Sequence, residues 1–164
     1  MPRPRRLLLL TALTLSSILL IIQPASATPP LIETFHDEGE FEFADCGDFQ
    51  LNETFTVDVR VITFFNAQGD AVRVAEHINF VGVITNSASG NTYRDPGHHQ
   101  FITDLTTGET TVVGVVFNTP VPGLGPVLHD AGKIVIDENG EATFVGGPHT
   151  VFFGTNPDPC TVLL

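Results

Sequence analysis

Apolar and polar residues alternate over a long central stretch, and this period of two constrains the fold more than any other feature of the chain. From Phe55 to Val61, apolar side chains occupy every second position, with Thr, Asp and Arg between them. Successive side chains of a β-strand point to opposite faces, so this pattern predicts a strand with one buried and one solvated face. No stretch after residue 27 shows the period of an amphipathic helix. The sequence therefore predicts an all-β domain.

Glycine-containing dipeptides between the apolar stretches predict how the strands pair. A two-residue turn at Gln68-Gly69 places Val61 opposite Glu76 and Val57 opposite Phe80. On the other face, the same register pairs polar residues with one another. A one-residue slip would reverse this sorting, so the pattern supports the register.

Two later dipeptides predict further hairpins. Asn139-Gly140 is the strongest hairpin signal in the chain and would join residues 133–137 to residues 141–146. Thr107-Gly108 would place Leu105 opposite Thr110.

The spacing of apolar stretches and turns predicts an antiparallel meander of about eight strands. They span residues 40–45, 53–66, 71–85, 91–105, 109–119, 127–137, 141–146 and 149–154, between partly ordered tails at 28–37 and 155–164. Closure of such a meander removes its exposed edges. We therefore expect a closed or nearly closed barrel, with a two-sheet β-sandwich as the alternative.

The chain contains two cysteines, Cys46 and Cys160. In an exported protein, an even number of cysteines predicts a disulfide. The two Cα atoms of a disulfide lie within about 7 Å of each other. The first and last structured segments are therefore expected to be neighbours.

The first 27 residues have the three parts of a secretory signal peptide. Arg3, Arg5 and Arg6 precede an uncharged apolar stretch from Leu7 to Ile22, and Ala25-Ser26-Ala27 forms a cleavage site. The apolar stretch is shorter than the roughly 20 residues of a membrane span. We expect a secreted, extracellular protein with no membrane span after cleavage. Residues 28–164 would form a single β-domain with its core at about residues 40–160.

The domain that follows this leader is strongly acidic. Its basic residues are Arg60, Arg73, Arg94 and Lys133, against 19 aspartates and glutamates. Such a surface repels nucleic acid and anionic lipid. It favours solubility, cationic partners or divalent ions.

The predicted register places polar residues among the inward-facing apolar ones. Glu76 lies opposite Val61, and Tyr93, Asp95 and His99 share its face if their strand continues without a slip. A mostly apolar interior with a few convergent polar groups is typical of a small-ligand pocket. The same groups would suit proton transfer. A bulge after Ala75 or at Pro96-Gly97 would instead turn these residues to the surface.

The histidines offer only a nonlocal metal site, formed by His99, His129 and His149. The sequence lacks the short ligand spacings of zinc sites, so we expect no metal. It also lacks a GxSxG elbow, a P-loop and a GxGxxG motif, so neither a hydrolase triad nor a nucleotide cofactor is predicted.

Short segments spread over the domain carry a family resemblance: Asp45-Cys46-Gly47, Thr85-Asn86, Gly132–Asp137 and Pro159-Cys160. Together with the leader, they resemble a group of uncharacterised small secreted actinobacterial β-domain proteins with one cysteine pair. The resemblance implies a β-domain and no particular chemistry. At the level of fold, the expected barrel is similar to dirigent and allene oxide cyclase barrels, by analogy alone.

These features favour a non-enzymatic secreted domain that binds a small apolar ligand or a partner. One alternative is a cavity enzyme of cyclase or isomerase type that uses Glu76 with Tyr93 or His99. Another is a structural or adhesive protein of the cell envelope. The sequence leaves the oligomeric state open.

Overall fold

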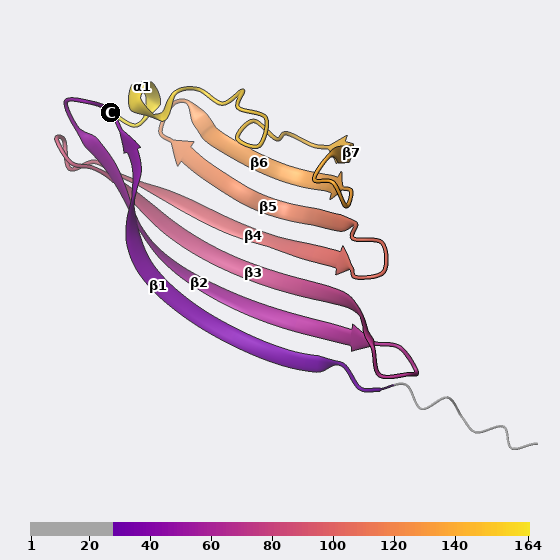
Figure 1. Ribbon diagram of the computed structural model, residues 1–164. Helices are drawn as coiled ribbons and strands as arrows, with labels where there is room; N and C mark the ends of the chain where they lie inside the picture. Colours follow the sequence, from indigo (N-terminus) through magenta and orange to yellow (C-terminus); the bar gives the residue numbers. More distant parts are fainter. Residues whose placement is uncertain (1–27) are drawn as a thin grey trace, which may run out of the picture.

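The computed structural model describes residues 28–164, and the predicted leader lies outside this range. The described chain forms one seven-stranded antiparallel sheet and a short C-terminal helix (Figure 1). The strands are β1 (Leu31–Asp45), β2 (Gln50–Phe65), β3 (Ala71–Asn86), β4 (Thr92–Asp104), β5 (Thr110–Val121), β6 (Gly125–Ile136) and β7 (Ala142–Gly146), and the helix is α1 (Pro159–Val162). The all-β meander is confirmed. Within residues 28–164, no helix has the length and apolarity that a membrane span requires.

The sheet is open, which corrects the expectation of a closed or nearly closed barrel. Each strand pairs with its neighbours in sequence, so β1 and β7 lie at the two edges (Figure 1). The eighth strand expected at residues 149–154 does not form. These residues make turns, with one isolated bridge between His149 and Asp130. This segment lies against β6 and adds no strand next to β7. In the described chain, no strand therefore connects β7 to β1, and the sheet does not close.

The predicted register of the central strands is confirmed up to Phe64, and a bulge before the turn then pairs Phe65 with Ala71 instead of Val72. Val61 pairs with Glu76 and Val57 pairs with Phe80. The β3–β4 ladder runs without a shift through Pro96-Gly97, so no bulge reverses the facing of β4. The side chains of β2, β3 and β4 that were predicted to point inward therefore lie on one face of the sheet.

The β4–β5 hairpin differs from the predicted one by two residues, with Thr103 rather than Leu105 opposite Thr110. The turn is longer than two residues because Asp104 organises it. The Gly108 amide donates to the Asp104 carbonyl oxygen at 2.8 Å, and the Thr106 amide donates to the Asp104 carboxylate at 2.8 Å. The hairpin at Asn139-Gly140 forms as predicted, between β6 and β7.

β1 is much longer than the predicted strand at residues 40–45. It begins at Leu31 and pairs with β2 along its length, so most of the expected N-terminal tail is strand. Glu33 and Asp37 lie at positions that face inward, so apolar and polar residues do not alternate regularly in the sequence of this segment. Backbone pairing with β2 nevertheless extends the strand.

The main apolar core lies at one end of the sheet. It is formed by Leu51, Ile84, Tyr93, Val127, Leu128 and Leu163. The β4–β5 pairing ends at His98, and beyond it this core brings together side chains of β2–β4 and of β6. α1 contacts both β1 and β6 at this end (Figure 1).

The C-terminal helix is fixed to this end by a disulfide and a cap. Cys46, just after β1, is bonded to Cys160 in α1, with the two Cα atoms 5.5 Å apart. Asp158 caps the helix by accepting a hydrogen bond from the Cys160 amide, and Pro159 suits the first helical position. The predicted disulfide is confirmed. It brings the first and last segments together without any strand pairing between them.

Candidate functional site

The four residues predicted to line a pocket do share one face of the sheet. We call it the inner face, the side that carries Val57. Register places Glu76 between Val61 and Phe101, His99 beside Ile78, Asp95 beside Gly82, and Tyr93 beside Ile84. Alternation along each strand then puts all four on this face.

They do not converge on one point of that face. Glu76 and Ile84, the partner of Tyr93, are roughly 26 Å apart along β3 at about 3.3 Å per residue. Glu76 is half-buried at one end, whereas Tyr93 lies in the core at the other. The Tyr93 hydroxyl donates to the Leu164 carbonyl oxygen at 2.5 Å, so it anchors the C-terminal segment. A single small ligand would not reach both side chains.

Asp95 is fully buried and fastens β4 to β5 where their backbone pairing has ended. Its Oδ1 atom accepts hydrogen bonds from the Asn118 amide at 2.9 Å and from the Thr119 hydroxyl at 3.0 Å. The carboxylate thus replaces a missing ladder bond. These two hydrogen bonds give Asp95 a structural role, because they hold β4 and β5 together where the two strands separate.

Glu53 on β2 is a second buried carboxyl group, which the prediction missed. Its side chain is 1 % exposed and lies over Gly82, where an added Cβ atom would collide with Glu53 Oε1. Gly82 is also the cross-strand partner of Asp95. Glu53 therefore reaches across β3, over the glycine, on the side of Asp95. Within the described chain, neither Glu53 Oε1 nor Asp95 Oδ2 has a hydrogen-bond partner.

Burial changes the protonation of this pair. Burial is the main cause that raises the pKa of Glu53 to about 7, and the nearby Asp95 carboxylate contributes to this rise. Burial also raises the pKa of Asp95, whereas its hydrogen bonds from Asn118 and Thr119 oppose that rise. Below neutral pH, Glu53 is the carboxyl group that holds a proton. Its position in phase with Leu51 and Phe55 was the sequence signal that it points inward.

His99 is a packed histidine. Burial is the main cause that lowers its pKa, a hydrogen bond with the Val115 backbone opposes this, and the charge of His98 adds to it. The ring packs edge-on against Phe101 with centroids 5.4 Å apart. Gly114 allows β4 and β5 to approach closely beside it, because an added Cβ atom there would collide with the His98 carbonyl oxygen and the Cα of His99.

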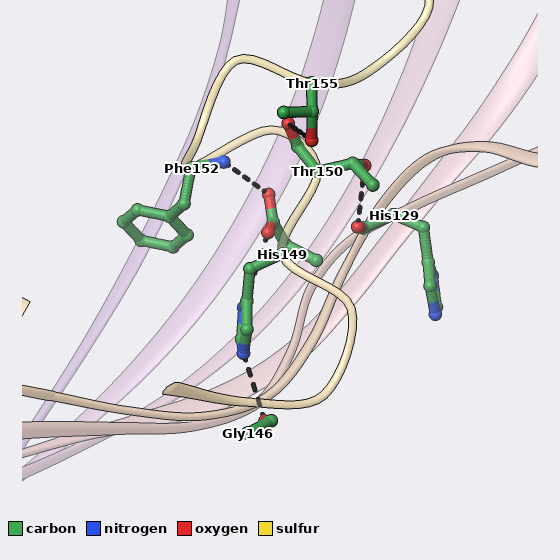
Figure 2. A network of polar contacts seen from close by, with 7 residues as sticks. His129, Gly146, His149, Thr150, Phe152 and Thr155 are labelled. Carbon is green, nitrogen blue, oxygen red and sulfur yellow. Dashed lines mark hydrogen bonds and ion pairs between the residues drawn. The ribbon is translucent and has the colours of Figure 1, made fainter. Parts of the chain in front are cut away.

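Asp130 and His149 form a buried polar network that attaches the segment after β7 to β6 (Figure 2). Asp130 Oδ2 accepts a hydrogen bond from the Phe152 amide at 3.1 Å, and Oδ1 lies 3.4 Å from His149 Nδ1. His149 Nε2 lies 3.2 Å from the Gly146 carbonyl oxygen. Because a carbonyl oxygen only accepts, Nε2 carries a hydrogen and Nδ1 faces the carboxyl group. Within the described chain, neither Asp130 Oδ1 nor His149 Nδ1 has a hydrogen-bond partner.

The histidines proposed as nonlocal metal ligands are not gathered. The His129 ring points away from His149 (Figure 2). In residues 28–164, no group of three or more His, Cys, Asp or Glu side chains is arranged to hold a metal ion. His129 instead borders a hollow of about 460 Å³ with Pro126 and Pro148.

Four phenylalanines from β1, β2 and β3 lie on the inner face, and three of them are in contact. We call Phe35, Phe41, Phe55 and Phe80 the phenylalanine patch. Phe41 contacts Phe55, and Phe55 stacks on Phe80, each pair with ring centroids 5.9 Å apart. Phe35 and Phe41 are 55 % and 44 % exposed. Phe41 lies beside the core end of the sheet, because it pairs with Glu53, two residues from Leu51, whereas Phe35 lies farther along β1 toward the other end.

Comparisons with protein-family models, with curated proteins and with solved structures gave no match to this chain.

Proposed function

We propose that this protein is a secreted, non-enzymatic binding domain, and that the phenylalanine patch engages a protein partner. The observation that carries the proposal is the exposure of Phe35 and Phe41 on the face that carries the stacked Phe55 and Phe80. Exposed apolar patches of this kind mark interaction surfaces. The disulfide fits the oxidising compartment to which the predicted leader would direct the chain.

The shape of the surface favours a macromolecule over a small ligand. Small-molecule sites are concave and enclose most of their ligand. The patch lies on an open sheet near its β1 edge. The polar groups that a cavity enzyme would use are separated along the sheet, and Tyr93 and Asp95 are occupied by structural hydrogen bonds.

The rim of the patch specifies the charge of the partner. Glu33 and Asp37 flank Phe35 on the same face of β1, and both are exposed. A partner with an apolar centre and a basic rim would complement both features.

The test is native mass spectrometry of the full chain recovered from the medium of the organism that makes it. Phe35→Ser/Phe41→Ser removes the exposed rings of the patch. Phe144→Ser/Phe152→Ser is the matched control, because those rings are 51 % and 46 % exposed but lie outside the patch. We expect a bound protein mass on the wild type and the control that is lost from the patch variant.

Two other results would contradict the proposal. A small-molecule mass that the patch variant loses would show a ligand carrier. A bare chain in all three samples would show that the patch holds no partner. Nile red fluorescence on the same samples reports whether the patch variant has lost its apolar surface.

A further inference from the structure

β1 leaves one side of its backbone unpaired. It is a 15-residue edge strand that pairs only with β2, and nearly all of its residues are exposed. An edge strand presents a row of free amide and carbonyl groups that can pair with another strand. Protection by proline or lysine is common at such edges, and β1 contains neither.

Acidic residues dominate β1, and its one basic side chain is His36, which is paired with Asp58 of β2. The acidic residues of β1 are Glu33, Asp37, Glu38, Glu40, Glu42 and Asp45, and the strand contains no lysine or arginine. Glu38, Glu40 and Glu42 occupy alternate positions, so they share the outer face, opposite the phenylalanine patch. Their spacing of roughly 7 Å equals that of alternate side chains on any added strand.

A hollow lies beside these carboxylates on the outer face. It has a volume of about 580 Å³, and its lining includes Glu38, Glu40, Thr54, Thr56, Val81 and Val83. Valine side chains and threonine methyl groups can receive the aliphatic stem of a long side chain. The carboxylates can hold its cationic head.

A second copy of the chain does not suit this edge. Antiparallel pairing of two β1 strands would bring two rows of carboxylates together, and like charges across a strand pair are destabilising. The same carboxylates would attract a strand that carries lysine or arginine.

We propose that β1 receives an extended segment of the partner as an additional strand, in which basic residues alternate with apolar ones. The basic side chains lie over Glu38, Glu40 and Glu42, and the apolar side chains lie toward Phe35 and Phe41 on the inner face. Backbone hydrogen bonds supply affinity, and the two faces supply specificity. This inference rests on the proposed function, because it identifies how the partner reaches the phenylalanine patch.

The probe is a synthetic peptide that alternates lysine with valine over the length of β1. Two control peptides accompany it, one with glutamate in place of lysine and one with alternate backbone nitrogens methylated so that it cannot pair. Titration calorimetry at low salt measures binding to the full chain. We expect the lysine peptide alone to bind, with slower hydrogen exchange at the amides of residues 31–45.

Protein variants then separate the two faces. Glu38→Gln/Glu40→Gln/Glu42→Gln removes the outer-face charges, and we expect it to weaken binding by about tenfold. Glu109→Gln/Glu138→Gln/Glu141→Gln makes the same change of net charge in exposed turns and should bind as the wild type does. Phe35→Ser/Phe41→Ser tests the patch.

Each contrary result has a distinct meaning. Strand addition is overturned if the lysine peptide does not bind, if the methylated peptide binds equally well, or if hydrogen exchange in β1 is unchanged. It is also overturned if the glutamine variant of β1 binds as its control does, or if sedimentation shows that the chain alone dimerises through this edge. If the phenylalanine variant loses binding and the methylated peptide still binds, the patch is a binding surface but strand addition is rejected. Full binding in the phenylalanine variant with loss in the β1 glutamine variant would retain the edge and reject the patch.

Discussion

Glu53 and Asp95 are two carboxyl groups held in the interior on either side of Gly82. Both side chains are almost fully buried, and each has one oxygen without a hydrogen-bond partner in the described chain. Two adjacent negative charges in such a place are unfavourable, so a proton on Glu53 stabilises the folded state. The pair therefore links folding to pH.

The first prediction concerns that link. The pKa of Glu53 rises from 4.5 to about 7 on folding, so its favourable contribution is complete below pH 4.5 and is lost as pH rises to about 7. Glu53→Gln removes the titration, so the free energy of unfolding of the wild type should fall relative to the variant by up to about 3 kcal/mol across this window. Urea denaturation of both proteins at a series of pH values measures the difference. The comparison also cancels the opposite contribution of His99, whose lowered pKa favours folding as pH rises.

The matched control is Glu40→Gln, which changes an exposed carboxylate of β1. Its difference from the wild type should be nearly independent of pH. A difference for Glu53→Gln that is equally flat would show that Glu53 is ionised in the folded protein.

At the scale of elements, the segment after β7 shows how side chains can replace strand pairing. Residues 149–154 contain β-favouring residues but form turns against β6. They are held by Asp130 and by Thr150, whose hydroxyl donates to the His129 carbonyl oxygen at 3.0 Å (Figure 2). A few polar contacts thus determine the position of a segment that has no ladder of its own.

The second prediction is that Asp130→Ala releases this segment. The change leaves the Phe152 amide and His149 without their buried partner, which is expected to cost about 2 to 4 kcal/mol. Cleavage by chymotrypsin after Phe152 or Phe153 should become faster than in the wild type. Asp58→Ala breaks the exposed contact between Asp58 and His36 and should leave the cleavage rate unchanged. Equal rates in all three proteins would show that Asp130 does not hold the segment.

At the scale of the whole molecule, the two ends of the sheet differ. One end has the apolar core, the helix and the disulfide, and the phenylalanine patch extends from beside this core along the inner face of β1, β2 and β3. The structured end provides a rigid support, and the open face provides the surface proposed to bind. Binding residues placed on a rigid sheet are held in a defined geometry.

The third prediction concerns the disulfide, which links residues separated by 114 positions in the sequence. Cys46→Ser/Cys160→Ser releases a closed loop of that length, and the loop-entropy model predicts a loss of about 4 to 5 kcal/mol in the free energy of unfolding. Urea denaturation should show a lower midpoint for this variant, and the wild type under reducing conditions should match it. A variant as stable as the oxidised wild type would show that the apolar core alone holds this end together.

Local pattern determined the strand character and much of the register. The alternation around Phe55 and the turn at Gln68-Gly69 were enough to pair β2 with β3 and to place Glu76 inward. Asn139-Gly140 predicted its hairpin, and the two cysteines predicted their bond. These features are readable because side-chain period and turn conformation depend on neighbours in sequence.

Tertiary structure alone decided the extent of β1, the open sheet and the depth of burial. Glu33 and Asp37 interrupt the alternation of β1, so its full length follows only from backbone pairing with β2. Residues 149–154 pack against β6 instead of forming an eighth strand. The burial of Glu53 over Gly82 likewise required three strands to come together. The sequence determined which side chains share a face. Which of them are covered depends on packing between distant segments, and no local pattern records that packing.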